Sequence, residues 1–144
     1  MKISIINGPN LNLLGNREPS IYGSTSFEDY LVSLKRIFSS VEFDYFQSNV
    51  EGELVNQIQK VGKNANGIIL NAAAYTHSSI AIADAISAIN IPVVEVHISN
   101  IYARESFRQN SITAPVCKGL ISGFGLESYK LAVQSFINES SLDQ

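Results

Sequence analysis

Glu95 and His97 are the residues of this chain whose types and spacing best suit proton transfer. They lie two apart in an apolar run, so on a strand both side chains face the same side of the sheet. A carboxylate in this position can hold one imidazole nitrogen and raise the basicity of the ring. His77 is the only other histidine. The pattern indicates acid–base chemistry, although a buried pair with a purely structural role fits it as well.

A second group of reactive side chains follows the first apolar run. Asn7-Gly8-Pro9-Asn10 ends that run with turn-forming residues, and the stretch that continues to Gly23 is long for a connection between elements. It contains Arg17 and, five residues later, Tyr22. Because the segment from Gly15 to Gly23 is polar and flanked by glycine, we expect a mobile lid. A plain turn with a packed tyrosine is the simpler alternative.

The apolar pattern predicts five strands alternating with helices, all in a single domain over residues 1–144. Ser26 is the expected N-cap of the first helix. Short helical turns are expected in the polar segment 100–110, and the last helix should fray from Asn138. Such alternation is typical of an α/β fold, a doubly wound five-stranded parallel sheet between two helix layers. The strands are expected at 3–6, 41–46, 67–71, 92–97 and 116–122, and the helices at 27–38, 54–61, 80–89 and 126–137.

Polar residues fall where these strands end. The carboxyl ends of parallel strands share one edge of a sheet, which is where open α/β sheets bind ligands. We therefore expect the polar groups to converge there, although Arg104 and Arg108 with Glu105 would equally suit a solvated helix face. The converging residues are Asn7, Asn10, Asn71, His77, Glu95, His97, Ser99, Arg104 and Arg108.

Composition excludes several classes of function. A net charge of −3 without a Lys/Arg cluster argues against nucleic-acid binding, and no apolar run approaches the length of a membrane span. The run from Ile3 to Ile6 is too short for a signal peptide, and Cys117 is the single cysteine, so we expect a cytoplasmic protein. The spacing of the histidines and Glu95 matches no familiar zinc motif.

A non-enzymatic module of the same fold class is the main rival interpretation. A receiver domain would need acidic residues after the first strand and an aspartate at the end of the third. This chain has Asn7, Asn10 and Asn71 there. A flavin-binding protein would need a Ser/Thr-rich phosphate loop, and the residues after Gly8 do not form one.

Five motifs in order along almost the whole chain resemble one family, type II 3-dehydroquinate dehydratase. The resemblance implies a flavodoxin-like fold and conversion of 3-dehydroquinate to 3-dehydroshikimate in the shikimate or quinate pathway. It also implies a dodecamer of four trimers, with no cofactor, no metal and no Schiff base. The motifs are Asn7-Gly-Pro-Asn-Leu-Asn-Leu-Leu-Gly15, Arg17-Glu-Pro19 with Tyr22-Gly23, Asn71 to His77, Glu95 to Asn100, and Arg104-Glu105 with Phe107-Arg108.

The resemblance also implies roles for individual residues. Tyr22 would remove the C2 proton, with Arg17 favouring its tyrosinate form. Asn10 would hold a water that stabilises the enolate. His97, oriented by Glu95, would protonate the departing C1 hydroxyl. The substrate would be bound by Asn71, His77, Ile98 (through its backbone), Ser99 and Arg108, and by Asp84 from a neighbouring subunit.

Two residues depart from the family pattern. Ala73 stands where glycine is common, and Ala83 stands where arginine is frequent. Neither is at a position with a catalytic role. The helix that contains Ala83 is apolar nearly all round, with Asp84 as its lone charge, so we expect part of it to be buried against another chain.

Overall fold

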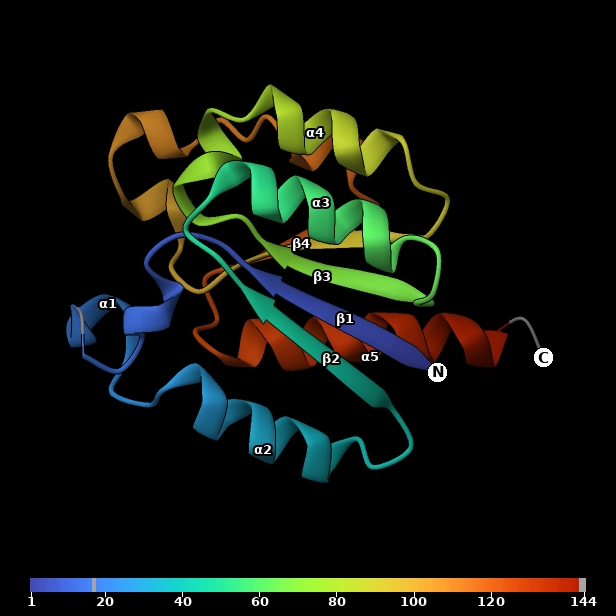
Figure 1. The fold of residues 1–144 in the computed structure, drawn as a ribbon. Coiled ribbons are helices and arrows are strands. Elements are labelled where there is room, and N and C mark those ends of the chain that lie inside the picture. Colours follow the sequence, from blue (N-terminus) through green and yellow to red (C-terminus); the bar gives the residue numbers. More distant parts are fainter. Residues whose placement is uncertain (17, 143–144) are drawn as a thin grey trace.

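The computed structural model describes residues 1–16 and 18–142, and they form a three-layer α/β/α structure (Figure 1). All strand pairs are parallel and their order is β2-β1-β3-β4-β5, which is the flavodoxin-like order. The doubly wound sheet expected from the sequence is confirmed. The strands are β1 (Lys2–Asn7), β2 (Glu42–Gln47), β3 (Gly67–Asn71), β4 (Val93–His97) and β5 (Gly119–Ser122).

Helices cover both faces of this sheet. Helices α2 and α5 lie on one face, and α3 and α4 lie on the other (Figure 1). Successive strand residues point to opposite faces, so Ile5 packs with the first helix pair and Ile6 with the second. Every residue of β3 and β4 is buried, as expected for parallel strands covered on both sides. The helices are α2 (Phe27–Ile37), α3 (Glu51–Val61), α4 (Ile80–Ser87) and α5 (Glu127–Leu142).

Local signals explain where several elements begin. The Ser26 hydroxyl accepts a hydrogen bond from the backbone N–H of Asp29 at 3.2 Å, which confirms it as the N-cap of α2. The long stretch after β1 contains a short 3₁₀ helix, Leu11–Leu13, and the single turn α1 (Pro19–Tyr22). The expected short turns between residues 100 and 110 are the 3₁₀ helices Ile101–Ala103 and Ser106–Arg108.

The last strand and the last helix differ from the sequence prediction. Strand β5 begins at Gly119 instead of Val116, because residues 114–116 form a 3₁₀ turn. The backbone N–H of Ala114 donates to the Ser111 hydroxyl, so the chain is turned away from the sheet just before the strand. Helix α5 continues to Leu142 instead of fraying from Asn138, and Glu139 within it pairs with Lys118.

Helix α4 ends at Ser87, two residues earlier than predicted, and its residues divide between two faces. Ile82, Ala83, Ala85 and Ile86 are buried within this chain, whereas Ile80, with 67% of its surface exposed, and Asp84 lie on the outer face. Within residues 1–16 and 18–142, no helix is long and apolar enough to cross a membrane.

Candidate active site

A cavity of about 170 Å³ lies at the carboxyl ends of β1, β3 and β4. Its walls come from the loop after β1, the 3₁₀ turn after β3 and the segment after β4. The edge of the sheet therefore brings together side chains that are far apart in the sequence, as expected. The predicted site residues that line the cavity are Asn10, Tyr22, Asn71, His77, His97, Ile98, Ser99 and Arg108.

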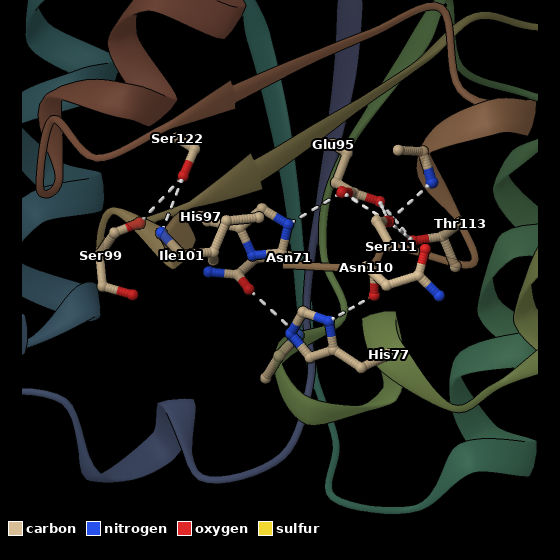
Figure 2. Close-up of polar contacts among 12 residues, drawn as sticks. Asn71, His77, Glu95, His97, Ser99, Ile101, Asn110, Ser111, Thr113 and Ser122 are labelled. Carbon is tan, nitrogen blue, oxygen red and sulfur yellow. Dashed lines mark hydrogen bonds and ion pairs between the residues drawn. The ribbon is translucent and has the colours of Figure 1, made fainter. Parts of the chain in front are cut away.

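His97 and Glu95 form a buried pair on β4. The Nε2 atom of His97 lies 2.9 Å from Glu95 Oε2, and Glu95 is fully buried behind the ring (Figure 2). This confirms that the two side chains share a face of the sheet and that the carboxylate holds one imidazole nitrogen. Because a carboxylate only accepts hydrogen bonds, Nε2 bears the hydrogen and Nδ1 is the nitrogen left for other partners.

Glu95 has two further donors besides His97. The hydroxyl of Ser111 lies 3.1 and 3.0 Å from its two oxygens, and the hydroxyl of Thr113 donates to Oε1 (Figure 2). Burial raises the pKa of Glu95, but the hydrogen bonds from His97, Thr113 and Ser111 outweigh it and leave the pKa below its usual value. A buried carboxylate with these donors stays ionised at neutral pH.

His77 reaches the same cavity from the 3₁₀ turn after β3 (Ala73–His77). Its Nδ1 atom lies 2.9 Å from the backbone carbonyl oxygen of Asn110 (Figure 2). A carbonyl oxygen can only accept, so Nδ1 bears the hydrogen and Nε2 is the free nitrogen. The His77 and His97 rings are nearly parallel, with centroids 6.2 Å apart and an interplanar angle of 22°.

Tyr22 meets a guanidinium in the cavity wall. Arg104 Nη1 donates to the Tyr22 hydroxyl at 3.1 Å and lies 3.4 Å from the Ser99 hydroxyl. The Arg104 carbon Cζ is 5.7 Å from the centroid of the Tyr22 ring. The Tyr22 hydroxyl therefore lies in direct contact with a positive charge. The family resemblance assigns no role to Arg104, and its spacing from Arg108 gives no signal that separates it from a solvated helix face.

The loop that presents Asn10 is fixed by close backbone packing. The N–H of Gly8 donates to the Asn71 carbonyl at 2.7 Å, and a Cβ atom on Gly8 would lie 2.6 Å from the Ala72 carbonyl oxygen, so only glycine fits. Asn10 has a left-handed backbone (φ 70°), and its N–H donates to the Asn49 side chain at 2.9 Å. These contacts hold Asn10 at the mouth of the cavity.

A buried tyrosine orients the asparagine at the end of β3. The Asn71 amide donates to the Tyr129 hydroxyl at 3.0 Å, and that hydroxyl donates to Asn7 at 2.7 Å. Tyr129 is fully buried on α5. The Asn71 side-chain oxygen accepts the N–H of Ala73 at 3.1 Å. Ala73 itself has φ 53°, a left-handed conformation that costs an L-residue with a side chain about 1–2 kcal/mol.

Arg108 lies at the outer side of the cavity, on the 3₁₀ turn Ser106–Arg108. Its Nε donates to Glu105 at 2.7 Å, and its guanidinium lies over Phe107. The pKa of the exposed Glu105 carboxyl is lowered by a backbone hydrogen bond and by Arg108. The remaining N–H groups of Arg108 can face an anionic ligand.

Two predicted site residues that the structure describes do not line the cavity, and a third is not among the described residues. Glu95 acts on it through His97, as described above. Asp84 is on the exposed face of α4 and not in this cavity. Arg17 lies outside the described residues.

A larger hollow of about 690 Å³ runs along β5 and α5, but it is open, and none of the described residues that line it is charged. In the part of the chain that the structure describes, no three His, Cys, Asp or Glu side chains are grouped as they would be to hold a metal ion. The smaller cavity is therefore the candidate active site.

Comparisons with known proteins identify the family of this chain. The family model for class II dehydroquinases matches residues 1–137. A 3-dehydroquinate dehydratase of Campylobacter jejuni subsp. jejuni is 54% identical over 95% of this chain and 87% of its own. One from Caldicellulosiruptor bescii is 55% identical over 92% of this chain and 93% of its own. The crystal structure of a type II dehydroquinase from Butyrivibrio crossotus superposes with a TM-score of 0.91 at 45% identity, covering 94% and 96% of the two chains. The chain therefore belongs to the class II dehydroquinase family.

Proposed function

We propose that residues 1–144 form one catalytic domain that removes water from 3-dehydroquinate to give 3-dehydroshikimate. The names of its relatives support the substrate. The observation on which the mechanism rests is a single cavity that contains both a tyrosine beside a guanidinium and a histidine backed by a carboxylate. These are the base and the acid that elimination from a β-hydroxyketone requires.

The first step is removal of a C2 proton by Tyr22. A tyrosine hydroxyl ordinarily ionises near pH ~10, so it needs a nearby cation to act as a base at neutral pH. Arg104 is such a cation, and Arg17 is the second that the resemblance proposes. The electron pair released from the C–H bond moves onto the C3 carbonyl oxygen and forms an enolate. Asn10 would stabilise this charge through a bound water.

The second step is loss of the C1 hydroxyl. The enolate reforms the carbonyl, the C1–C2 double bond forms, and the C1–O bond breaks. His97, protonated on both ring nitrogens, gives the Nδ1 proton to the departing oxygen, which leaves as water, and the neutral ring that remains keeps its hydrogen on Nε2. Because Glu95 holds Nε2, the ring is aimed with Nδ1 away from the carboxylate. The elimination would be anti, with Tyr22 and His97 acting from opposite faces of the substrate.

The other lining residues would bind the substrate. Arg108 would pair with the substrate carboxylate, because a guanidinium can make two parallel hydrogen bonds to it. Asn71, His77, Ser99 and the backbone of Ile98 would hold the hydroxyl groups.

The direct test is to incubate the purified protein with 3-dehydroquinate and to measure the enone absorbance of the product, which should rise with time. Tyr22→Phe and His97→Ala should each lower kcat by at least ~10²-fold, the usual scale for a general acid or base. Both should keep the circular dichroism of the wild type. Near-normal turnover of Tyr22→Phe would remove Tyr22 from the role of base.

The mechanism proposed here needs neither an imine nor a metal. Among the described residues that line the cavity there is no lysine to form an imine with the ketone. Borohydride added with substrate, or a chelator, should therefore leave activity intact. Inactivation by either reagent contradicts the proposal.

We also propose the assembly that the resemblance implies, a dodecamer of four trimers in which Asp84 completes a neighbour's site. Its exposed position beside the exposed Ile80 on α4 supports this role. Asp84→Ala should weaken the trimer and lower activity together, while the subunit stays folded. Sedimentation of the wild type should show a particle much larger than a monomer, and a fully active monomer at micromolar concentration would overturn the shared site.

A further inference from the structure

Four consecutive residues, 110–113, contact both histidines of the active site, one directly and one through a glutamate. The Asn110 carbonyl accepts from His77 Nδ1 at 2.9 Å, and the hydroxyls of Ser111 and Thr113 donate to Glu95, which holds His97 (Figure 2). We call residues 110–113 the histidine clasp. The sequence pattern assigned none of them a role.

The histidine clasp is itself tied to the rest of the site. The N–H of Ile112 donates to the Thr76 carbonyl at 2.8 Å, next to His77 in the chain. The N–H of Ala114 donates to the Ser111 hydroxyl at 2.9 Å, so this oxygen accepts from the backbone and directs its own hydrogen to Glu95. Thr113 is fully buried. The donors to Glu95 are thus held in place before any substrate binds.

The two histidines are consequently held in opposite tautomers. His77 faces a carbonyl through Nδ1 and offers Nε2, whereas His97 faces a carboxylate through Nε2 and offers Nδ1. The first is fixed by a main-chain oxygen, which never loses its acceptor character. The second depends on Glu95 remaining ionised, because a protonated Glu95 would donate to Nε2 and move the ring hydrogen to Nδ1.

We propose that Ser111 and Thr113 are positioning residues that keep Glu95 an acceptor and thereby keep a hydrogen on Nε2 of His97, so that Nδ1 is the nitrogen that takes up the catalytic proton and gives it away. Their two hydroxyl hydrogen bonds replace the water that a buried carboxylate has lost. Their importance for turnover rests on the proposed function, since it requires His97 to be the acid. The tautomers themselves do not depend on any substrate.

Few other titratable groups face this pair. His77 stacks near His97, and Cys117 lies close enough to Glu95 for the charge to act on it. Burial and the Glu95 charge raise the pKa of Cys117 to about 12, so it stays a neutral thiol over the working pH range. Tyr22, Arg104 and Arg108 line the same cavity. The hydrogen-bond partner of His77 is a neutral carbonyl, that of Asn110.

The first test uses the ligand-free protein. The chain has two histidines, so ¹⁵N labelling of histidine gives four ring nitrogen signals, assigned with the variant His77→Gln. At neutral pH we expect one ring with hydrogen on Nδ1 and the other with hydrogen on Nε2. Finding the same tautomer in both rings overturns the proposal, whatever the protein does to 3-dehydroquinate.

The second test removes the donors. Thr113→Val keeps the side-chain shape but has no hydroxyl, Ser111→Ala removes the other donor, and Thr113→Ser is the matched control that retains it. In the double variant Thr113→Val/Ser111→Ala, a neutral His97 ring with hydrogen on Nδ1 and none on Nε2, distinct from the doubly protonated imidazolium, should appear and grow as the pH falls. The His77 tautomer and the Thr113→Ser protein should stay as in the wild type. If the double variant does not fold, Thr113→Val alone gives the same comparison.

The kinetic readout separates positioning from a merely structural role. The double variant should lower kcat at least ~10-fold with little change in KM, because the acid and not the binding is affected. The pKa of Glu95 should rise, so the pH limb that reports the Glu95–His97 pair should move up by about one unit. An unchanged His97 tautomer and an unmoved pH limb in a folded variant would show that the two hydroxyls only fill space.

Discussion

The guanidinium of Arg104 donates a 3.1 Å hydrogen bond to the hydroxyl of Tyr22, although 82 residues separate them in the chain. The loop after β1 and the segment after β4 are therefore joined at the proposed base. A hydrogen bond from a charged donor is stronger than one between neutral groups, so this contact would stabilise negative charge on the hydroxyl oxygen.

Removal of that cation should impair Tyr22 specifically. Arg104→Ala should lower kcat/KM at least ~10-fold, which corresponds to about 1.4 kcal/mol of transition-state stabilisation. In a Tyr22→Phe background the same change should cost much less, because the group it serves is gone. Arg36→Ala, on the exposed last turn of α2, is the control and should leave activity unchanged. Fully additive effects in the double-mutant cycle would mean that Arg104 does not act through Tyr22.

Replacing Ala73 with glycine should stabilise the fold. The φ of 53° at this position strains an alanine by about 1–2 kcal/mol, and glycine would remove this strain. The larger entropy of glycine in the unfolded state would cancel about 0.5–1 kcal/mol of that gain. Ala73→Gly should therefore raise the free energy of unfolding by about 0.5–1 kcal/mol in urea titrations at a fixed protein concentration. Ala74→Gly, one residue later and without a positive φ, should lower it. The same sign for both variants would contradict a strained Ala73.

Loss of the Tyr129 hydroxyl should disturb both stability and binding. Tyr129→Phe leaves the amides of Asn7 and Asn71 without their shared buried partner, which should cost about 1–3 kcal/mol of unfolding free energy. Because Asn71 lines the cavity, KM should also rise. Tyr102→Phe is the control and should behave as the wild type, because Tyr102 is 63% exposed. A Tyr129→Phe protein of normal stability would show that the two amides find other partners.

Glu95 should make the fold sensitive to acid. The pKa of Glu95 is lowered in the folded state, so its ionised form adds to the free energy of unfolding. This stabilisation is fully present above pH 4.5, the ordinary pKa, and is lost as the pH falls through the lower pKa of the folded state. The thermal unfolding midpoint of the wild type should therefore decrease once the pH is lowered below about 4.5. Glu95→Gln should be less stable at pH 7, and its stability should change less over the acid range. Parallel curves for the two proteins would mean that Glu95 is not ionised in the fold.

Local patterns predicted most of the fold. The continuous apolar run from Gly67 to Asn71 is β3 with the predicted bounds, and Ser26 caps α2 as expected. The same-face relation of Glu95 and His97 followed from the two-residue repeat of a strand alone. The convergence of polar residues followed from the shared edge of a parallel sheet.

Features that depend on contacts between distant segments could not be predicted in this way. Ser111 and Thr113 lie 16 and 18 residues after Glu95, and their hydroxyls resemble those of any polar loop until the fold places them. The same contacts explain why β5 starts later than its apolar pattern predicts. Arg104 gained its partner through the loop after β1, and the left-handed backbone of Ala73 has no signature in an alanine.

The hydrogen bonds of the Tyr129 hydroxyl determine when, during synthesis of the chain, the cavity can take its final geometry. Tyr129 belongs to α5, which leaves the ribosome after all five strands, yet it orients Asn71 on a strand made much earlier. A nascent chain that ends before this residue can pair its first strands but leaves the Asn7 and Asn71 amides without their common partner. The polypeptide therefore completes the geometry of its cavity only when α5 has docked, and termination before α5 yields a sheet without an ordered site.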